Sequence, residues 1–231
     1  MYQQMTLFDL ENRETEKYVR RVSYADVKPF LLNVHYARRM PCVTDAFGLF
    51  LDGEMVGCVT YGVPASPPLC RGIAGDENVD HVLELNRLVI SPKIPGGGSK
   101  KNLASYLVSH SLKMLPNGTF VVSYADTGWT HVGYVYQACN FLYTGCTKKR
   151  IDRYVPEGKH CRHYDKSCSL HQTRNPKHRY VYLVGDRRTR KRMREELRYP
   201  VYDHYPKGDE RRYDEADPQI AEPIRILPRE K

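Results

Sequence analysis

The sequence predicts an α/β (α+β) fold in which helices flank a mixed central sheet, followed by a basic C-terminal extension. Strand-like and helix-like segments alternate through the middle of the chain, which requires a crossover connection and a parallel strand pair. The 231 residues are 41% hydrophobic and 27% charged, which fits one globular domain with an extension and excludes wholesale disorder. We expect the folded domain over residues 17–185, between a flexible peptide (1–16) and a basic helix with a C-terminal arm (186–231).

The chain before the first hairpin predicts a strand and a helix. Residues 18–23 (YVRRVS) are typical of a short strand. Ser23 and Asp26 form the Ser-x-x-Asp pattern of a helix start, and apolar residues recur at helical spacing over residues 26–39. We expect Pro41 to end this helix, because proline does not continue a helical hydrogen-bond pattern.

A β-hairpin and a series of alternating elements follow. Apolar runs over residues 46–51 and 55–61 flank an Asp-Gly turn, the strongest short signal of a hairpin. The proline- and glycine-rich residues 64–80 predict a loop. The elements expected after it are a strand (82–90), a glycine-rich loop (91–101), a helix (102–115), a strand (119–125), a helix (131–140), a strand (141–153), a polar loop insertion (154–177), a strand (179–184) and a basic helix (187–198). The tail from Tyr199 is expected to have little core of its own.

Three glycines lie where the strand over residues 82–90 leads into a helix. Glycine lets backbone N–H groups turn toward a ligand, and a helix N-terminus adds partial positive charge. The pattern is neither a Walker A loop nor the dinucleotide-binding Gly-x-Gly-x-x-Gly. It is therefore either a phosphate-binding loop or a plain flexible one. Its candidate ligand-binding residues are Gly96, Gly97, Gly98, Ser99 and Lys100.

The positive charge of the chain is concentrated in one stretch. Residues 148–198 contain 17 Lys or Arg and 6 Asp or Glu, whereas the other 180 residues carry a net charge of −2. Concentrated charge with interspersed tyrosines favours phosphate contact, to nucleic acid or to a cofactor, over a merely solvated basic surface. The candidate DNA-binding residues are Lys148, Lys149, Arg150, Arg187, Arg188, Arg190, Lys191 and Arg192.

The order strand, glycine loop, helix, strand and second helix resembles the acyl-CoA-binding half of GNAT-type acyltransferases. The second helix carries Gly133, Tyr136, Asn140 and Phe141 at the matching places. The resemblance implies that the loop holds the pyrophosphate of coenzyme A and that Tyr136 protonates the leaving thiolate. A phenol is a reasonable acid toward a thiolate. Tyr136 as an ordinary core residue is the alternative.

Four segments together resemble one narrower family, the Mom family of phage DNA-modification enzymes, which have a GNAT-like fold. This resemblance implies that the protein converts the N6 amine of adenine in duplex DNA to a methylcarbamoyl (acetamido-type) adduct, which protects DNA from host restriction. The alternatives are an N-acyltransferase acting on a protein or small-molecule amine, and a non-catalytic module that binds nucleic acid. The segments are His35-Tyr36, ELNRLVISP around Arg87, residues 123–145 (SYADTGWTHVGYVYQACNFLYTG) and residues 177–185 (KHRYVYLVG).

The same resemblance implies roles for single residues. Asp126 is expected to orient or deprotonate the adenine amine, and Arg87 to hold a phosphate or a carboxylate of the cofactor, a plain salt bridge being the alternative. His35 and Tyr36 are expected to bind the substrate or a metal, with helix-end capping as the alternative. The family's association with iron makes His35, Tyr36 and Asp126 a candidate N/O site.

The donor and the extrusion of the base follow from the implied chemistry. A simple acetyl transfer lacks the nitrogen of a methylcarbamoyl group, so the donor is either acetyl-CoA-like or an activated glycine. Adenine N6 is a poor nucleophile, which requires close alignment with the carbonyl and stabilisation of the oxyanion. Access to N6 in a duplex requires base flipping, for which Tyr124 and Trp129 are candidate stacking residues, with core packing as the alternative.

Three further predictions concern metals, partners and location. The residues His160, Cys161, His163, Cys168 and His171 are either a zinc site or polar groups that face DNA. Residues 4–8, Gln4 to Phe8 (QMTLF), resemble the peptide with which bacterial proteins dock on the sliding clamp, although Leu7 and Phe8 could instead pack on the sheet. We expect a protein of the bacterial host cytoplasm with reduced cysteines and no membrane contact.

Overall fold

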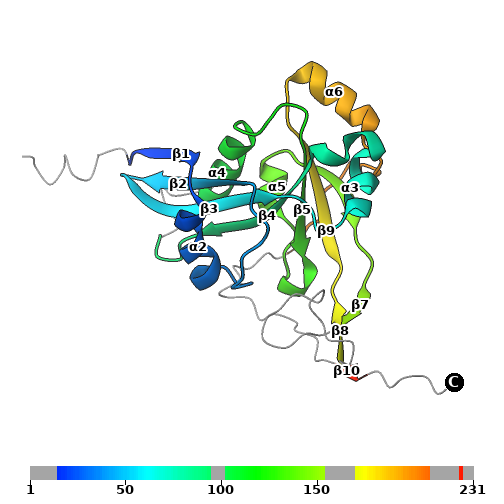
Figure 1. The fold of residues 1–231 in the computed structure, drawn as a ribbon, viewed down its shortest axis with the longest axis horizontal. Helices are drawn as coiled ribbons and strands as arrows, with labels where there is room; N and C mark the ends of the chain where they lie inside the picture. The colour runs from blue at the N-terminus through cyan, green and yellow to red at the C-terminus, as the bar shows by residue number, and fades with distance from the viewer. Residues whose placement is uncertain (1–14, 95–101, 154–169, 209–223, 226–231) are drawn as a thin grey trace, which may run out of the picture.

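A computed structural model describes residues 15–94, 102–153, 170–208 and 224–225. Its strands form a seven-stranded sheet in the order β1-β2-β3-β4-β5-β9-β6 and a three-stranded sheet in the order β10-β8-β7 (Figure 1). Among the described strands only β4 and β5 pair in parallel, so the predicted mixed sheet is confirmed. The strands are β1 (Lys17–Arg21), β2 (Asp45–Leu51), β3 (Glu54–Gly62), β4 (Val82–Ile90), β5 (Phe120–Asp126), β6 (Leu142–Cys146), β7 (Arg150–Arg153), β8 (Leu170–Arg174), β9 (Lys177–Leu183) and β10 (Ile224–Arg225).

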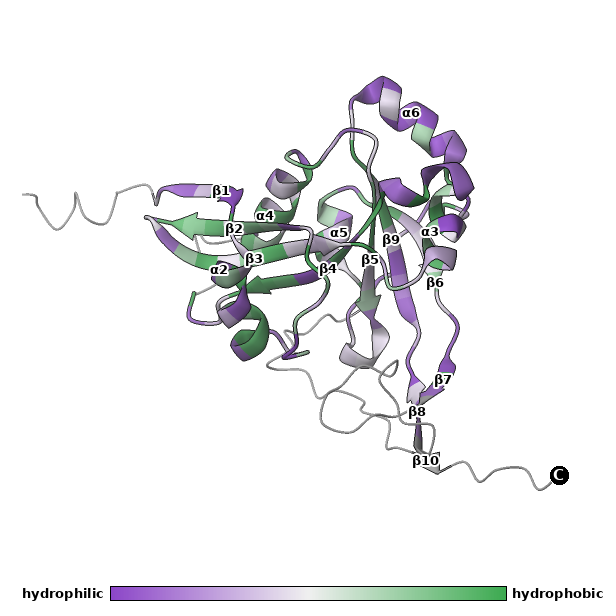
Figure 2. Ribbon diagram, viewed as in Figure 1, coloured by the Kyte–Doolittle hydropathy of each residue, from purple (hydrophilic) through white to green (hydrophobic). Residues whose placement is uncertain are grey.

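Helices cover both faces of the large sheet. We call the side covered by α4 and α5 the α4 face, and the side covered by α2, η1, α3 and α6 the α3 face. Figure 2 shows that the green, hydrophobic strands run between these layers, whereas α6 is mostly purple. The helical segments are α2 (Tyr24–Pro29), η1 (Phe30–Val34), α3 (Pro67–Ala74), η2 (Asp76–His81), α4 (Leu103–Leu112), η4 (Thr127–Trp129), α5 (Tyr134–Ala138) and α6 (Arg187–Glu196).

Successive residues of the central strands pack in hydrophobic cores on opposite faces of the sheet. Val121 packs in the cluster on the α4 face, and Val122 packs under α3 in the cluster on the α3 face. The same alternation separates Leu85, which joins the α4-face core, from Val82 on the α3 face. This alternation follows from the pleat of the strand, and it means that neighbouring residues of β4 and β5 present their side chains to opposite sides of the sheet.

The predicted local signals at the N-terminal end of the fold are confirmed. Ser23 caps α2, since its hydroxyl accepts from the Asp26 N–H and the Asp26 carboxylate accepts from the Ser23 N–H. The predicted hairpin joins β2 to β3 through Asp52 and Gly53, which both have positive φ. A turn of this kind requires two left-handed residues, which explains the Asp-Gly pair.

The helix predicted over residues 26–39 is shorter than expected. The α-helix α2 gives way after Pro29 to the π-helix η1, and His35 leaves the helix with an extended backbone (φ −68°, ψ 135°). The helical segment therefore ends well before Pro41, which does not terminate it. This early end brings His35 and Tyr36 over the sheet instead of leaving them on a helix surface.

The prediction of a loop over residues 64–80 is wrong, because these residues contain α3 and η2. Pro67 and Pro68 occupy the first helical positions. A backbone N–H at these positions has no acceptor within the helix, so the missing N–H of proline breaks no hydrogen bond there. Composition alone suggested a loop, but Cys70 and Ile73 bury one side of α3 against the α3 face.

Two predicted segments of the second half also differ. The helix expected over 131–140 is reduced to α5, because Gly133 adopts a left-handed conformation (φ 84°) and starts it late. The strand expected over 141–153 is two strands, of which β6 joins the large sheet and β7 pairs with β8. Residues 170–174 of the predicted loop insertion are therefore the strand β8, and β7 with β8 forms an arm that extends beyond β9 (Figure 1). We call this the β7–β8 arm.

The tail after α6 packs onto the domain, contrary to the sequence-based expectation. Residues 199–208, which we call the C-terminal strap, run over β6 and α5. Tyr205 donates a hydrogen bond of 2.7 Å to the Phe141 carbonyl, and Tyr134 donates one of 2.8 Å to the Gly208 carbonyl. Gln137 of α5 also donates to the Pro206 carbonyl at 3.1 Å. The strap thereby ties α5 to the sheet.

Candidate active site

A cleft opens in the sheet where the two parallel strands separate. β4 and β5 pair only from Val82 with Phe120 to Glu84 with Val122, although each strand runs on for several residues. Beyond this point the Ser123 hydroxyl reaches the Leu85 carbonyl at 3.0 Å. Figure 1 shows β4 and β5 running apart. We call this opening the β4–β5 cleft.

The β4–β5 cleft contains a cavity of about 560 Å³. Most of its lining comes from the two separating strands, the first turn of α4, α5 and the segment after η1, and β9 adds Lys177. The residues that carry candidate chemistry in this lining are His35, Tyr36, Glu84, Arg87, Tyr124, Asp126, Tyr136 and Lys177. Ile94 and Asn102, which flank the glycine loop, also line it.

The cavity is lined from both faces of the sheet. Tyr136 lies on the α4 face, where it packs at 5.4 Å from Phe141 and 5.3 Å from Tyr180 (ring centroids). Tyr124 packs against the α3-face cluster, and Asp126 follows it by two residues on the same strand. Asp126 and Tyr136 therefore line one cavity from opposite faces of the sheet.

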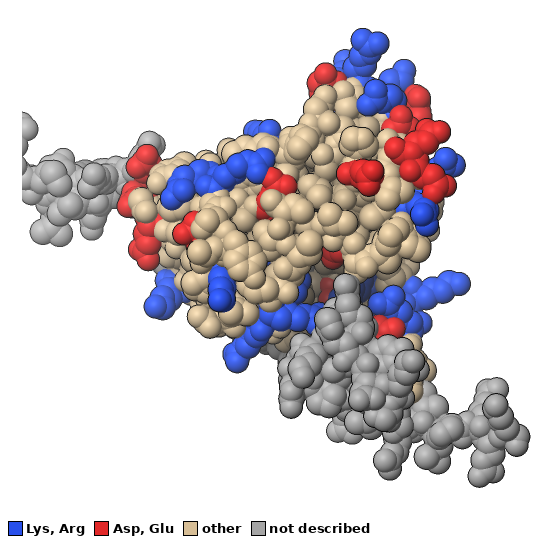
Figure 3. Space-filling view, viewed as in Figure 1, with Lys and Arg blue, Asp and Glu red and all other residues tan. Residues whose placement is uncertain are grey.

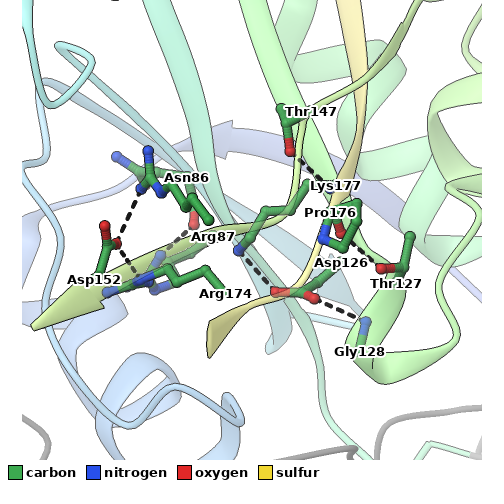
Figure 4. Close-up of polar contacts among 11 residues, drawn as sticks. Asn86, Arg87, Asp126, Thr127, Gly128, Thr147, Asp152, Arg174, Pro176 and Lys177 are labelled. Carbon is green, nitrogen blue, oxygen red and sulfur yellow. Dashed lines mark hydrogen bonds and ion pairs between the residues drawn. The ribbon is translucent and has the colours of Figure 1, made fainter. Parts of the chain in front are cut away.

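Asp126 is held by two contacts at the end of β5. Its Oδ1 accepts a hydrogen bond of 2.9 Å from the Gly128 N–H, and its Oδ2 lies 2.8 Å from the Lys177 ammonium (Figure 4). Lys177 is the cross-strand partner of Asp126 in the pairing of β5 with β9. The sequence interpretation missed Lys177, because only the strand register places these two residues opposite each other.

Aromatic rings gather beside Asp126. The rings of His35 and Tyr36 stack at 4.3 Å between centroids, and those of Tyr36 and Trp129 lie 4.8 Å apart. Tyr36 keeps 39% of its surface exposed. Burial of its hydroxyl end and the nearby Asp126 carboxylate raise the pKa of the Tyr36 phenol. The three rings form a surface onto which a planar group can stack.

His35 is a neutral imidazole in this site. It is buried, and its Nδ1 accepts a hydrogen bond of 3.0 Å from the Ala37 N–H, which assigns the proton to Nε2. Burial, together with the positive charges of Arg87 and Arg39, lowers the pKa of His35 to about 3. An uncharged N–H donor in the cavity suits a carbonyl or a ring nitrogen of a bound substrate.

The residues expected to bind iron lie together in the cavity. The Nδ1 of His35 accepts from the Ala37 N–H, which leaves Nε2 as the ring nitrogen that could hold a metal. The two oxygens of Asp126 contact the Gly128 N–H and the Lys177 ammonium. The described part of the chain contains no group of three or more His, Cys, Asp or Glu residues placed to hold a metal, and iron binding by His35, Tyr36 and Asp126 stays a prediction.

Arg87 lies on the α3-face side of the cleft, next to His35 and Tyr36. Its Nη1 donates a hydrogen bond of 2.5 Å to the Asn86 carbonyl, and its buried Nε has no hydrogen-bond partner in the described part of the chain. Burial lowers the pKa of this guanidinium. Asn86 is the extra residue of a bulge in β4, because Leu85 pairs with Tyr61 and Arg87 with Thr60. The bulge directs Arg87 into the cavity.

Glu84 is a second carboxyl group in the cavity that the sequence interpretation missed. It is the last β4 residue paired with β5, and it lies on the α3 face with Tyr124. Burial raises the pKa of Glu84, while the positive charges of Arg87 and Lys177 oppose this shift. The sequence does contain one indication of Glu84, because it is a charged residue within the apolar strand VLELNRLVI. A charged residue in a buried strand usually has a function or a charged partner.

A known protein family covers most of the chain. The Mom protein family matches residues 16–207. The chain belongs to this family. Over 118 residues it is 30% identical to the Methylcarbamoylase mom of Escherichia phage Mu, in a match that covers 48% of this chain and 46% of that protein. The chain thus matches less than half the length of this relative.

Solved structures of acetyltransferases show a more distant likeness. Arabidopsis thaliana NAA60 in complex with acetyl-CoA is 13% identical, with a TM-score of 0.45, and the match covers 73% of this chain and 99% of that one. The putative acetyltransferase yncA of Salmonella typhimurium is 11% identical with a TM-score of 0.45, over 74% and 95% of the two chains. Likeness at this level assigns no function to the chain.

The predicted DNA-binding residues of this Mom family member lie at two separate ends of the molecule. Lys148, Lys149 and Arg150 lie at the root of the β7–β8 arm, where the Thr147 N–H donates to the Lys177 carbonyl. The helix α6, with the other five residues, contacts the opposite end of β5, since Asn117 donates to its Thr189. Figure 3 shows basic side chains at both places. The cavity is next to the arm, and Asp126 in its lining lies about 20 Å from the α6 end of β5, the length of this strand.

Several predicted features lie outside the described residues. These are the glycine-loop residues Gly96 to Lys100, the clamp-binding peptide Gln4–Phe8, and four of the five residues of the candidate zinc site. His171, the fifth, is in β8. None of the described helices is long and apolar enough to cross a membrane.

Proposed function

We propose that this Mom family member is a DNA-modifying acyltransferase that converts adenine N6 to a methylcarbamoyl-type adduct. The observation that carries the proposal is one cavity lined from the α4 face by Tyr136 and from the α3 face by Asp126. A cavity that is lined from both faces can hold an acyl donor and an amine on its opposite sides, where they meet. The family match and the name of the phage Mu relative support DNA as the source of the amine.

The α4 side of the cavity suits the acyl donor. Ile94, Leu103 and Val135 give this side an apolar lining, and the cavity extends to Asn102 at the start of α4. An acetyl-CoA-like thioester or an activated glycine would place its acyl arm here, and the sequence prediction assigns its phosphates to Gly96–Lys100, which lie outside the described residues. When bound, such a donor supplies an activated carbonyl. Tyr136 is positioned to give its phenol proton to the leaving group.

The α3 side of the cavity suits a flipped adenine. The ring surface of His35, Tyr36 and Trp129 offers stacking for an extruded base. Asp126, fixed by the Gly128 N–H and Lys177, can accept a hydrogen bond from the N6 amine and orient it. The neutral Nε2–H of His35 can donate to a ring nitrogen, and the free Nε–H of Arg87 to a phosphate or carbonyl oxygen. Aligning the amine in this way compensates for its weak nucleophilicity.

The β7–β8 arm is the proposed duplex-binding element. Extruding a base requires firm contacts to phosphates within a few nucleotides of the cavity. Lys148, Lys149 and Arg150 are exposed at the root of the arm, next to Lys177 at the cavity mouth. Their charges favour DNA through release of counterions from its phosphates.

Co-expression of the protein with a plasmid tests the proposed function. Nucleosides from the plasmid are analysed by mass spectrometry, and the plasmid is digested with restriction enzymes that cut adenine-containing sites. We expect a methylcarbamoyl-type adenine and resistance to digestion, both strongly reduced by Tyr136→Phe or Asp126→Asn. The exposed Tyr24→Phe variant is the matched control.

Two other outcomes contradict the proposal. Unmodified DNA together with acyl transfer to protein or small-molecule amines would identify an ordinary N-acyltransferase. Unmodified DNA with only salt-sensitive DNA binding would identify a non-catalytic binding module.

A further inference from the structure

The β7–β8 arm carries an exposed isoleucine among basic residues. Ile151 of β7 keeps 59% of its surface exposed, the largest fraction among the exposed large hydrophobic residues of the described chain. It belongs to none of the hydrophobic clusters on the two faces of the large sheet. Lys148, Lys149 and Arg150 precede it directly, and all three are exposed. Ile151 therefore contributes little buried surface to folding, and its surroundings suit an anionic partner with an apolar surface.

The two faces of the arm differ in how their side chains are held. Arg150 pairs with Arg174 across the strands, and Asp152 follows Arg150 by two residues, so these three side chains share one face. The Asp152 carboxylate lies 2.6 Å from the Arg174 Nε (Figure 4) and 3.3 Å from an Arg150 Nη. Ile151 points to the opposite face, where its cross-strand partner is Thr173. The ion pairs thus occupy one face, and Ile151 stays exposed on the other.

The pairing of the two strands holds the Ile151 side chain in place. Ile151 and Thr173 are both β-branched, which restricts rotation about χ1. The ion pairs of Asp152 with Arg150 and Arg174 join β7 to β8 directly beside them. A side chain that is already restricted loses little conformational freedom when it is inserted into a partner, which favours binding.

Ile151 lies close to the cavity mouth but outside the cavity. The root of the arm is joined to β9 by two hydrogen bonds of 2.9 Å, from the Thr147 N–H to the Lys177 carbonyl and from the Lys177 N–H to the Thr147 hydroxyl. Lys177 lines the cavity, whereas Ile151 does not. Ile151 follows Thr147 by four residues, which span at most about 14 Å. A duplex that sends a base through this mouth therefore lies within reach of Ile151, and the cavity stays free for the base.

We propose that Ile151 is a wedge that enters the base stack of duplex DNA and fills the position from which the target adenine is extruded. This inference rests on the proposed function, which requires an extruded base. Extrusion leaves a gap between neighbouring base pairs, and proteins that unstack DNA insert apolar side chains such as isoleucine between base steps. The cations of Lys148, Lys149 and Arg150 hold the phosphates next to this gap.

Truncation of the Ile151 side chain tests the inference. The variants are Ile151→Ala, Ile151→Leu and the control Val63→Ala; Val63 is an aliphatic residue that is 58% exposed and lies outside both the arm and the cavity lining. The probe is a set of duplexes in which 2-aminopurine replaces one adenine in every combination of neighbouring bases, because its fluorescence rises when it leaves the stack. Each variant is also measured for plasmid adenine modification by mass spectrometry, for thermal unfolding, and for the salt dependence of duplex binding.

The expected results separate extrusion from binding. Ile151→Ala should lower the 2-aminopurine signal and plasmid modification about tenfold, because nothing then fills the gap. Ile151→Leu keeps a side chain of the same size and should retain most of both, and Val63→Ala should equal wild type. The salt dependence and thermal unfolding of Ile151→Ala should be unchanged, since Ile151 is uncharged and exposed. The deficit should shrink for a 2-aminopurine without a pairing partner, which is easier to extrude.

Two results would overturn the role of Ile151. One is an Ile151→Ala variant with the 2-aminopurine signal and plasmid modification of Val63→Ala. The other is a deficit of equal size for paired and unpaired 2-aminopurine, because Ile151 would then act in binding and not in extrusion. A wild-type protein that raises the 2-aminopurine signal but leaves plasmid adenine unmodified would instead contradict the proposed function alone.

Discussion

His35 is buried and its imidazole is uncharged, so the stability of the fold depends on pH through this residue. In the unfolded chain the imidazole titrates near its usual pKa of about 6.5. In the folded protein burial and the charges of Arg87 and Arg39 lower this pKa to about 3. Between these two values the unfolded state binds a proton that the folded state does not. The contribution of His35 to stability is therefore complete above about pH 6.5 and is lost as the pH falls toward 3.

The variant His35→Asn should reduce this loss of stability in acid. The expected difference in pH dependence is about 2 kcal/mol between pH 7 and pH 5, because each pH unit below the unfolded pKa costs about 1.4 kcal/mol. Chemical denaturation at both pH values measures it. The exposed His81→Asn is the matched control, and its pH dependence should equal that of wild type. A His35→Asn variant as acid-sensitive as the control would show that His35 is not held neutral.

Single residues of the site were predictable from sequence to different degrees. His35, Tyr36, Arg87, Asp126 and Tyr136 were named from the resemblance of short segments to known families, and all five line the cavity. Glu84 and Lys177 were missed. Their importance depends on the strand pairing, which brings Lys177 opposite Asp126 and ends the β4–β5 ladder at Glu84. A sequence motif contains only a residue and its near neighbours in the chain. It therefore does not show which residues of two distant strands pair with each other.

At the level of elements, the predictions were accurate where hydrophobic periodicity is strong. β4 has the predicted bounds, and the β2–β3 hairpin forms at its Asp-Gly turn. The errors occur where packing overrides composition. The proline-rich start of α3 and the charged tail suggested irregular chain. However, α3 buries Ile73, and the C-terminal strap hydrogen-bonds to α5 and, through the Tyr202 N–H, to β6.

The contact between the C-terminal strap and the sheet can be tested with one hydroxyl group. Tyr205→Phe removes the hydrogen bond to the Phe141 carbonyl while keeping the ring. A hydrogen bond of this kind contributes about 1 kcal/mol, which corresponds to a decrease in Tm of about 2–4 °C for a protein of this size. Thermal unfolding measures this change. Tyr24→Phe, at an exposed ring outside the strap, is the control. Equal Tm values for the two variants would mean that the strap does not stabilise the domain.

At the level of the whole molecule, the fold divides a charge that is continuous in sequence. Residues 148–198 form one basic stretch, but β9 crosses the sheet in the middle of it. Of the described residues before β9, Lys148 to Arg150 lie at the cavity mouth, and the part after β9 becomes α6 at the far end of β5. Figure 3 shows acidic side chains beside α6, and Asp76, Glu77 and Asp80 belong to the nearby η2. The two basic regions therefore differ in their electrostatic surroundings and in their distance from the cavity.

Two charge-reversal variants of equal size distinguish the roles of these regions. Lys148→Glu with Lys149→Glu changes the β7–β8 arm, and Arg188→Glu with Arg190→Glu changes α6; all four side chains are exposed. The logarithm of the DNA-binding constant falls with the logarithm of the salt concentration, and each phosphate contact contributes about 0.9 to the steepness of this fall. The steepness should therefore decrease by up to about 2 in the arm variant. This variant should also lose most adenine modification.

The α6 variant should bind DNA somewhat more weakly because its net charge is lower. It should retain modification, because its side chains lie too far away to hold phosphates next to an extruded base. Loss of modification in the α6 variant alone would instead place the duplex across α6 and would require a path for the base along the length of β5.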